Sequence, residues 1–122
     1  MRVLVVDDSK TVRSAVQRIL HPRGIVVLTA VDGIAALCVV EQQQPDIIFM
    51  DLMMPRLDGY QCCRLIKRHE KYRNIPVVML SSKDSVFDRA RGRLAGSEHY
   101  LRKPITQENL LDTIAAHVEL TL

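Results

Sequence analysis

Polar side chains that can bind a metal ion or phosphate recur directly after short apolar segments of this sequence. They are Asp7, Asp8, Asp51, Ser81 and Lys103. Three carboxylates cannot share a crevice at neutral pH without a counter-charge, because each raises the pKa of the others. A divalent cation would supply that charge, and oxygen ligands with no His or Cys nearby favour Mg²⁺ over Ca²⁺ or Zn²⁺. Asp7 and Asp8 are therefore predicted to hold a metal ion.

Asp51 is the candidate nucleophile, because it stands alone after its apolar segment whereas Asp7 and Asp8 are adjacent. An aspartate carboxylate can attack phosphorus and form an aspartyl phosphate. Such a transfer requires neutralisation of charge on three equatorial oxygens. Mg²⁺, the Lys103 ammonium group, and the Ser81 hydroxyl or a backbone N–H would each serve one oxygen. These residues predict phosphoryl transfer to Asp51.

The segments that must position these residues alternate along the chain. Short apolar runs rich in β-branched residues predict strands at Arg2–Val6, Ile25–Ala30, Asp46–Met50, Pro76–Leu80 and His99–Arg102. Their apolarity is continuous, which suits strands that are covered on both faces of a parallel sheet. Ligands bind beyond the carboxyl ends of such strands, so we expect the polar residues to meet there.

Helical spacing predicts a helix after each strand. The predicted helices are Ser9–Leu20, Gly33–Gln43, one capped by Asp58, one that starts near Ser85, and one capped by Thr106. A cap formed by Asp8 or Ser9 is the alternative to a metal role for a single aspartate. Five strands alternating with five helices indicate an α/β fold with a doubly wound, five-stranded parallel sheet. The length favours the (βα)5 flavodoxin-like strand order 2-1-3-4-5.

Length and composition predict one domain over residues 1–122. The chain is 48% hydrophobic and 25% charged, as globular proteins are, and its net charge of +3 is too small to indicate nucleic-acid binding. No apolar run is long enough to span a membrane and no signal-peptide core is present, so a cytoplasmic location without membrane insertion is expected. Cys38, Cys62 and Cys63 are expected to be reduced thiols, with Cys62 in the core. The four histidines are scattered and form no ligand set.

Four short motifs occur in the order and spacing of a known family. They are "VVDDS" at Val5–Ser9, "DLMMPRLDG" at Asp51–Gly59, "VVMLSS" at Val77–Ser82 and "YLRKP" at Tyr100–Pro104. With these motifs the sequence resembles the receiver domain of two-component response regulators over essentially all 122 residues. The resemblance implies a phosphorelay regulator, with no output domain in this chain, that controls protein partners.

The resemblance also assigns the chemistry of the site. It implies that Asp51 accepts a phosphoryl group from a phosphohistidine on a sensor histidine kinase, in single-turnover chemistry rather than as an enzyme. It implies that the backbone carbonyl of Met53 joins Asp7, Asp8 and Asp51 in holding Mg²⁺. Lys103 would sense the added charge, and its peptide bond to Pro104 is expected to be cis.

A conformational switch is implied as well. The phosphoryl group would select the state in which Ser81 reorients toward it and Tyr100 swings inward. The expected surface for a downstream target is the face of the fourth helix, fifth strand and last helix. That face would carry Lys83, Arg89, Arg91, Arg93 and Tyr100.

The segment "MLSSKDSVFDRARGRLAGSEHYLRKP" narrows the resemblance. It is similar to stand-alone receivers of the type IV pilus twitching-motility system, a chemotaxis-like pathway, which implies a chemotaxis-type kinase. Met53, Ser82 and Lys83 depart from the commonest receiver pattern beside the pocket, where residues influence the lifetime of the phosphate. The sequence therefore makes no prediction of that lifetime.

Three other functions fit parts of the pattern less well. A small Mg²⁺-dependent aspartyl-phosphate phosphatase generally carries a second acid two residues after the nucleophile, where this chain has Met53. An FMN or nucleotide carrier on the same fold is disfavoured because the chain has no glycine-rich phosphate motif. DNA binding through the basic helices would normally need a helix-turn-helix, for which the chain has no room.

Overall fold

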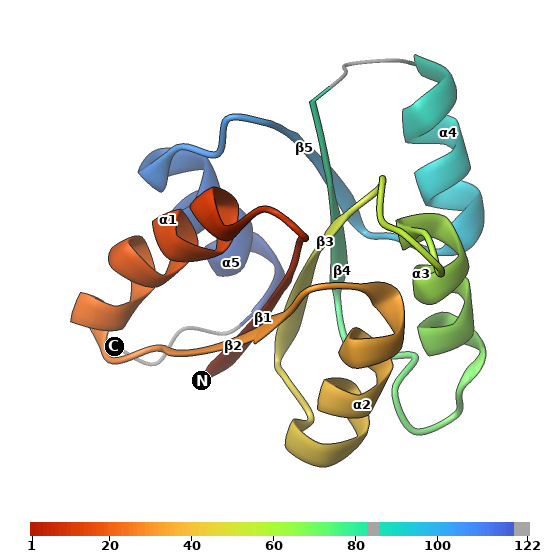
Figure 1. The fold of residues 1–122 in the computed structure, drawn as a ribbon, viewed down its shortest axis with the longest axis horizontal. Coiled ribbons are helices and arrows are strands. Elements are labelled where there is room, and N and C mark those ends of the chain that lie inside the picture. Colours follow the sequence, from red (N-terminus) through yellow and green to blue (C-terminus); the bar gives the residue numbers. More distant parts are fainter. Residues whose placement is uncertain (83–85, 119–122) are drawn as a thin grey trace.

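The chain forms a five-stranded parallel sheet between two layers of helices (Figure 1). The computed structural model describes residues 1–82 and 86–118. In chain order the elements are β1 (Arg2–Val6), α1 (Lys10–Leu20), a 3₁₀ turn (His21–Arg23), β2 (Val26–Ala30), α2 (Gly33–Gln43), β3 (Ile47–Asp51), α3 (Gly59–Arg68), β4 (Val77–Ser81), α4 (Val86–Ala95), β5 (His99–Arg102) and α5 (Gln107–His117). The strand order β2-β1-β3-β4-β5 confirms the predicted topology.

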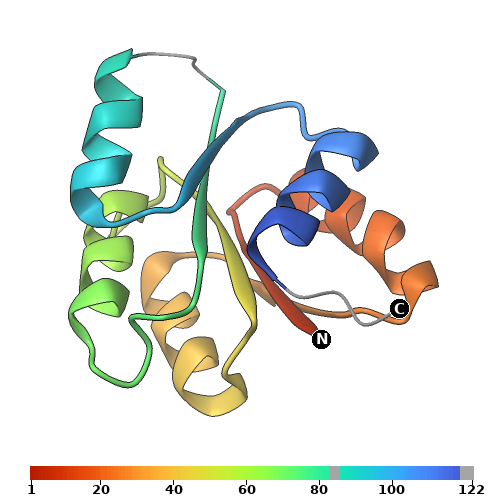
Figure 2. The ribbon, with the colours of Figure 1, turned by 180° about the vertical axis from the view of Figure 1, so that it is seen from behind.

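Helices cover both faces of the sheet, with α1 and α5 on one face and α2, α3 and α4 on the other (Figure 1, and from behind in Figure 2). Successive side chains of a strand point to opposite faces. In β1, Val3 and Val5 therefore enter the core on the side of α1 and α5, whereas Leu4 and Val6 enter the core on the side of α2, α3 and α4. Burial on both faces explains the continuous apolar runs.

Two of the predicted site residues belong to the strands themselves. β3 and β4 each begin and end one residue later than predicted, so β3 ends at Asp51 and β4 ends at Ser81. The parallel ladder extends this far because Asp51 pairs with Leu80 and Ser81 pairs with Arg102. The backbone of each residue is thus fixed by sheet hydrogen bonding. β2 also starts one residue later than predicted.

Polar side chains cap α1, α2, α3 and α5, and the sequence predicted two of these caps, those of α3 and α5. Ser9, rather than Asp8, caps α1, so its side chain accepts a backbone N–H from the first turn. Asp58 caps α3 within a reciprocal capping box, and Thr106 caps α5. The predicted start near Ser85 lies outside the described residues.

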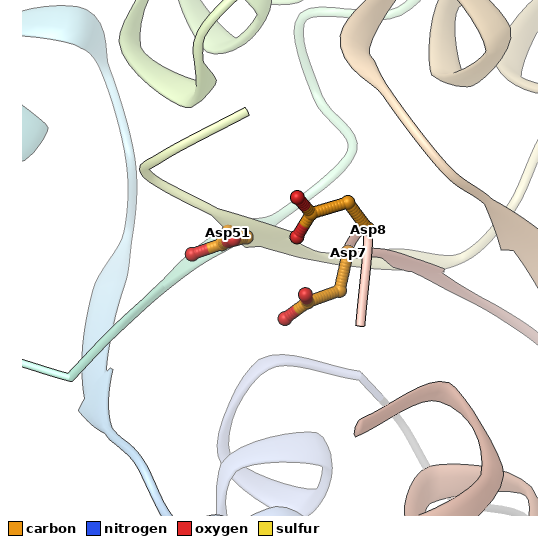
Figure 3. A group of neighbouring side chains, drawn as sticks. All are labelled: Asp7, Asp8 and Asp51. Atoms are coloured by element: carbon orange, nitrogen blue, oxygen red, sulfur yellow. The ribbon is translucent and has the colours of Figure 1, made fainter. Parts of the chain in front are cut away.

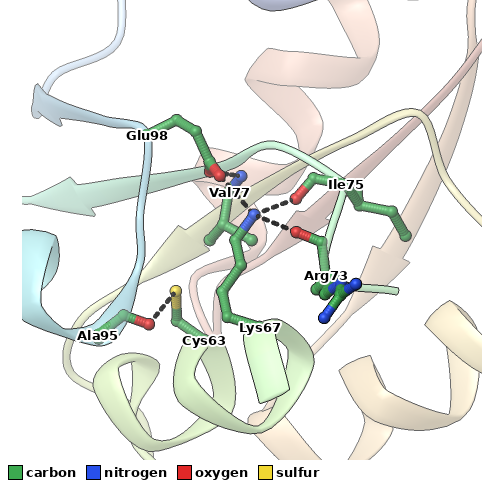
Figure 4. A network of polar contacts seen from close by, with 7 residues as sticks. All are labelled: Cys63, Lys67, Arg73, Ile75, Val77, Ala95 and Glu98. Atoms are coloured by element: carbon green, nitrogen blue, oxygen red, sulfur yellow. Dashed lines mark hydrogen bonds and ion pairs between the residues drawn. The ribbon is translucent and has the colours of Figure 1, made fainter. Parts of the chain in front are cut away.

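The Lys67 side chain, near the end of α3, ties together the segments that lead into β4 and β5 (Figure 4). Its ammonium group donates to the carbonyls of Arg73 at 3.1 Å and Ile75 at 2.6 Å, and it pairs with Glu98. Glu98 also accepts the N–H of Val77 at 2.6 Å. Only 13% of the Lys67 side chain is exposed, so its charge is largely buried. These contacts supply the partners that a buried ammonium group needs, at the amino edge of the sheet.

The structure confirms Cys62 as a core residue and contains the three cysteines as free thiols. Cys62 and Cys63 are fully buried in α3, Cys38 is exposed, and none of the three is in a disulfide. Burial raises the pKa of the Cys62 and Cys63 thiols to about 12. Both thiols are therefore protonated at neutral pH. Within residues 1–82 and 86–118, every helix is too short or too polar to serve as a membrane span.

Candidate metal and phosphoryl-acceptor site

Three carboxylates meet at the carboxyl edge of the sheet. Asp7 and Asp8 follow β1, and Asp51 ends the neighbouring β3. One carboxylate oxygen of each residue lies within 4.8 Å of the others, and Figure 3 shows the three side chains gathered at this edge. Asp7 is fully buried, Asp51 is nearly so, and Asp8 is exposed. The structure thus brings together the three aspartates that the sequence proposed as metal ligands.

The Lys103 ammonium group links two of these carboxylates. The Lys103 N–H donates to the carbonyl of Ser81 at 2.7 Å, which holds the residue at the same edge of the sheet. Its Nζ lies 2.7 Å from Asp7 Oδ2 and 3.3 Å from Asp51 Oδ1. Burial acts to lower the pKa of Lys103, but the two carboxylates outweigh it and raise that pKa above its ordinary value. The peptide bond to Pro104 is cis, as expected.

Asp51 occupies an electrostatically unfavourable position. Burial is the largest influence on its pKa and raises it, and repulsion from Asp7 acts in the same direction. Lys103 and the N–H of Met53, which lies 3.4 Å from Asp51 Oδ1, oppose that rise without cancelling it. The pKa of Asp51 therefore lies above the ordinary aspartate value. A bound dication would favour the ionised form of this carboxylate, which is the form that attacks phosphorus.

The donor atoms at this edge suit a hard divalent cation. Asp7 Oδ1 accepts the N–H of Ser9 at 2.9 Å, whereas its buried Oδ2 has the charge of Lys103 beside it and no well-directed hydrogen bond from the described residues. An incompletely satisfied buried carboxylate oxygen costs free energy, which a bound cation would offset. The grouped ligand atoms are all carboxylate oxygens. Magnesium prefers such ligands, so the residues present fit Mg²⁺.

A cleft opens beside Asp51. Its lining includes Met53, Tyr60, Ser81, Arg91 and Lys103 as well as Asp51 itself. Ser81 is buried at the end of β4, whereas 80% of Met53 is exposed. The cleft therefore places the predicted acceptor carboxylate, hydroxyl and ammonium group around one space. Its lining comes from the ends of β3 and β4, the β3–α3 loop, α3, α4 and the residue after β5.

The β3–α3 loop is held in place by an ion pair within it and by close packing between its two ends. Arg56 adopts the left-handed conformation, with φ of 68°, which is uncommon for a residue other than glycine. Its guanidinium forms an ion pair with the buried Asp32, and the N–H of Ala35 together with this ion pair holds the pKa of Asp32 below its ordinary value. Where the loop enters α3, a Cβ on Gly59 would lie 2.4 Å from the Asp51 carbonyl oxygen. The acceptor and its loop are therefore closely packed.

Sequence reasoning missed part of the cleft. It gave Tyr60 and Asp88 no role, and it placed Arg91 on the expected target-binding face. The structure places all three in the lining of the cleft that contains Asp51. Asp88 and Arg91 are three residues apart and so share one face of α4. Which neighbour that face meets depends on how α4 packs on α3, and no local sequence pattern encodes that packing.

The other residues of the expected target-binding face lie apart from the cleft. Arg89, Arg93 and Tyr100 line a separate hollow between α4 and β5. Tyr100 is half-buried, and the Arg89 guanidinium lies 5.3 Å from the centre of its ring. Lys83 lies outside the described residues.

Sequence comparison identifies relatives of the chain. Residues 3–115 match the response regulator receiver domain family. Protein PilG of Pseudomonas aeruginosa is 52% identical over 118 residues, which cover 97% of this chain and 87% of PilG. Response regulator MprA of Mycobacterium avium is 40% identical over 116 residues, and the chain spans about half the length of MprA.

Comparison with solved structures also finds similar chains. Chemotaxis protein CheY4 of Vibrio cholerae superposes with a TM-score of 0.90 at 32% identity, covering 96% of this chain and 98% of that one. The receiver domain of the sensor histidine kinase PA1611 of Pseudomonas aeruginosa, which has a magnesium ion coordinated in its active site cleft, gives 0.87 at 31% identity and covers 95% of each chain. The chain therefore belongs to the response regulator receiver domain family.

Proposed function

We propose that this receiver domain accepts a phosphoryl group on Asp51 with the help of Mg²⁺ and thereby switches its binding to protein partners. The observation that carries the proposal is the position of Lys103 Nζ, 2.7 Å from Asp7 and 3.3 Å from Asp51, at the edge where three carboxylates meet. Transfer to a carboxylate requires this combination of a nucleophile, a fixed cation and a metal-binding group.

The proposed metal ligands are Asp7, Asp8, Asp51 and the backbone carbonyl of Met53. When bound, Mg²⁺ would neutralise charge on the transferred phosphoryl oxygens. Asp51 forms the new bond to phosphorus, and Lys103 faces a second phosphoryl oxygen. Support comes from the oxygen-only donor group and from the magnesium ion in the cleft of the related PA1611 receiver domain.

The proposed conformational switch couples the cleft beside Asp51 to the hollow between α4 and β5. Ser81 would turn its hydroxyl toward the phosphoryl group, and Tyr100 would move inward behind it. Support comes from the parallel pairing of β4 with β5, which makes Ser81 and Tyr100 parts of neighbouring strands. A target protein would then bind the face of α4, β5 and α5, where Arg89, Arg93 and Tyr100 lie.

Receiver domains imply a histidine-kinase donor and a downstream target in general. For this chain we propose a chemotaxis-type sensor kinase and a role in type IV pilus twitching motility in the cytoplasm, with residues 1–122 acting as one domain. The identity of 52% with PilG supports this assignment. Family membership does not favour the phosphatase alternative, and the exposed Met53 supplies no second acid beside the nucleophile.

The test of this function is labelling with acetyl phosphate and Mg²⁺, followed by intact mass spectrometry. The wild type should gain one phosphoryl group, and Asp51→Asn should gain none. Asp112→Asn is the matched control, because Asp112 is an exposed aspartate on α5, and it should be labelled like the wild type. A chelator should abolish labelling. Equal labelling of wild type and Asp51→Asn would reject the proposal, and sustained turnover of a phosphomonoester would support a phosphatase instead.

A further inference from the structure

The guanidinium group of Arg91, on α4, lies over the ring of Tyr60, on α3, at 4.1 Å from the ring centre. This distance is well within the range of a cation–π interaction. Tyr60 is buried, whereas Arg91 is exposed. Contact with this buried ring therefore restricts the positions that the Arg91 guanidinium can adopt.

Tyr60 is itself fixed by α4. Its hydroxyl lies 3.2 Å from the Asp88 carbonyl oxygen and 3.3 Å from Asp88 Oδ1, as a hydrogen-bond donor to both. Burial, reinforced by the nearby carboxylate of Asp88, raises the pKa of Tyr60 to about 12, so the hydroxyl keeps its proton. Asp88 and Arg91 share one face of α4. One tyrosine thus anchors the helix and orients its arginine.

Arg91 lines the same cleft as Asp51 and Lys103. Lys103 is already engaged by two carboxylates, at 2.7 Å and 3.3 Å. Stacking of a guanidinium on a ring face, in contrast, uses none of its N–H donors. An anion that enters the cleft therefore meets a planar set of donors that is suited to phosphate oxygens.

We propose that Arg91, held on Tyr60, is a specificity-determining residue that favours dianionic phosphodonors. Its guanidinium binds oxygens of the incoming donor outside the metal-binding group. In the transfer from acetyl phosphate, Asp51 forms the bond to phosphorus while the phosphorus–oxygen bond breaks, and acetate departs with the electron pair. With phosphoramidate the phosphorus–nitrogen bond breaks, and the protonated nitrogen departs as ammonia. The inference rests on the proposed function, because it concerns the choice of donor for Asp51.

The experiment compares two donors on the same protein with Mg²⁺. Acetyl phosphate is a dianion at neutral pH, whereas phosphoramidate carries a protonated nitrogen that offsets one negative charge. Labelling rates are measured for the wild type, Arg91→Ala, Arg91→Gln and the control Arg64→Ala, which removes an exposed arginine of α3 outside the cleft. Arg91→Gln keeps a long polar side chain without the charge, and it serves as a second variant in case Arg91→Ala perturbs the helix.

For an exposed charge we expect Arg91→Ala and Arg91→Gln to lower the acetyl phosphate rate about fivefold and the phosphoramidate rate much less. Added salt should slow the wild type with acetyl phosphate more than it slows either variant. Arg64→Ala should behave like the wild type. Tyr60→Phe, which keeps the ring, should keep the donor preference, and Tyr60→Leu should reduce it.

Two outcomes would overturn the inference. In the first, the Arg91 variants have wild-type rates with both donors; in the second, they lose both rates equally. In either case Asp51 would still be labelled in the wild type, so the proposed function would stand. If the wild type were not labelled on Asp51 by either donor, the proposed function would fail and the inference would fail with it.

Discussion

Lys103 Nζ lies 2.7 Å from Asp7 Oδ2, an ion pair that joins the residue after the last strand to the residue after the first. Asp7 is fully buried, and 20% of the Lys103 side chain is exposed. A buried carboxylate whose partner is removed keeps its desolvation cost without compensation. The stability of the metal-free protein should therefore depend on this ammonium group.

Lys103→Met, which removes the charge and keeps an unbranched side chain, tests that dependence. We expect a loss of about 2 kcal/mol in the free energy of unfolding without metal, because Asp7 and Asp51 then face each other without a cation. Urea denaturation with and without Mg²⁺ measures the free energy of unfolding. Bound Mg²⁺ should reduce the difference in this free energy between Lys103→Met and the wild type. Lys10→Met, at an exposed position of α1, is the control. Equal stability of Lys103→Met and wild type without metal would contradict the expectation.

Asp51→Asn should stabilise the metal-free protein at neutral pH. The pKa of Asp51 is raised in the folded state, so the folded protein binds this proton more tightly than the unfolded chain does. The ionised group therefore destabilises the fold above its folded pKa. That cost disappears as the pH falls through the folded pKa toward the unfolded value of about 3.9.

Thermal unfolding in a chelator at several pH values measures this effect. The advantage of Asp51→Asn over the wild type should be largest at neutral pH and should shrink under acid conditions. The exposed Asp112→Asn should show no such trend. A lower midpoint for Asp51→Asn than for the wild type at neutral pH would show that attraction to Lys103 outweighs burial and repulsion.

Gly59→Ala should disturb the acceptor directly. The new Cβ would lie 2.4 Å from the Asp51 carbonyl oxygen and 3.0 Å from the Leu52 Cα, so the backbone must move. We expect a loss of about 2 kcal/mol, typical of overpacking, together with slower labelling of Asp51. Gly24→Ala is the control, because Gly24 has φ of 73° and open space around it. Alanine there strains its own backbone conformation without displacing a neighbouring atom. That variant should lose about 1 kcal/mol and label normally.

Lys67→Met should weaken the fold and leave the chemistry intact. It removes the donor to the Arg73 and Ile75 carbonyls and the partner of Glu98 (Figure 4). We expect a loss of about 2 kcal/mol in unfolding free energy, because the Arg73 and Ile75 carbonyls lose their donor and the partly exposed Glu98 loses its ion-pair partner. The labelling rate of the folded fraction should equal that of the wild type. A large loss of labelling rate in a stably folded Lys67→Met would show that the two edges of the sheet are coupled.

Periodicity and the residues at the strand ends were enough to predict the fold and the convergence of the site. Continuous apolar runs predicted strands buried on both faces, and the two cores on either side of β1 explain why that pattern is informative. Parallel strands share one carboxyl edge, so Asp7, Asp51 and Lys103 could be placed together without coordinates.

Features that depend on packing between helices or on unusual backbone could not be predicted in this way. The platform of Tyr60 under Arg91 depends on how α3 and α4 lie against each other. Arginine is not a residue that indicates a left-handed conformation, so the shape of the β3–α3 loop at Arg56 had no sequence signal. The one-residue shift of Asp51 into β3 follows from hydrogen bonding to a neighbouring strand, which the local apolar pattern does not contain.

The ion pair between Asp7 and Lys103 joins the ends of β1 and β5, which β3 and β4 separate in the sheet, so it is complete only in a chain where these four strands are paired. Contacts between segments that are distant in sequence slow folding, because the chain between them must close into a loop first. A dication at this edge would consequently distinguish the finished domain from a nascent or partly unfolded chain. By mass action, Mg²⁺ that bound only the folded site would raise the apparent stability of the domain as its concentration rose.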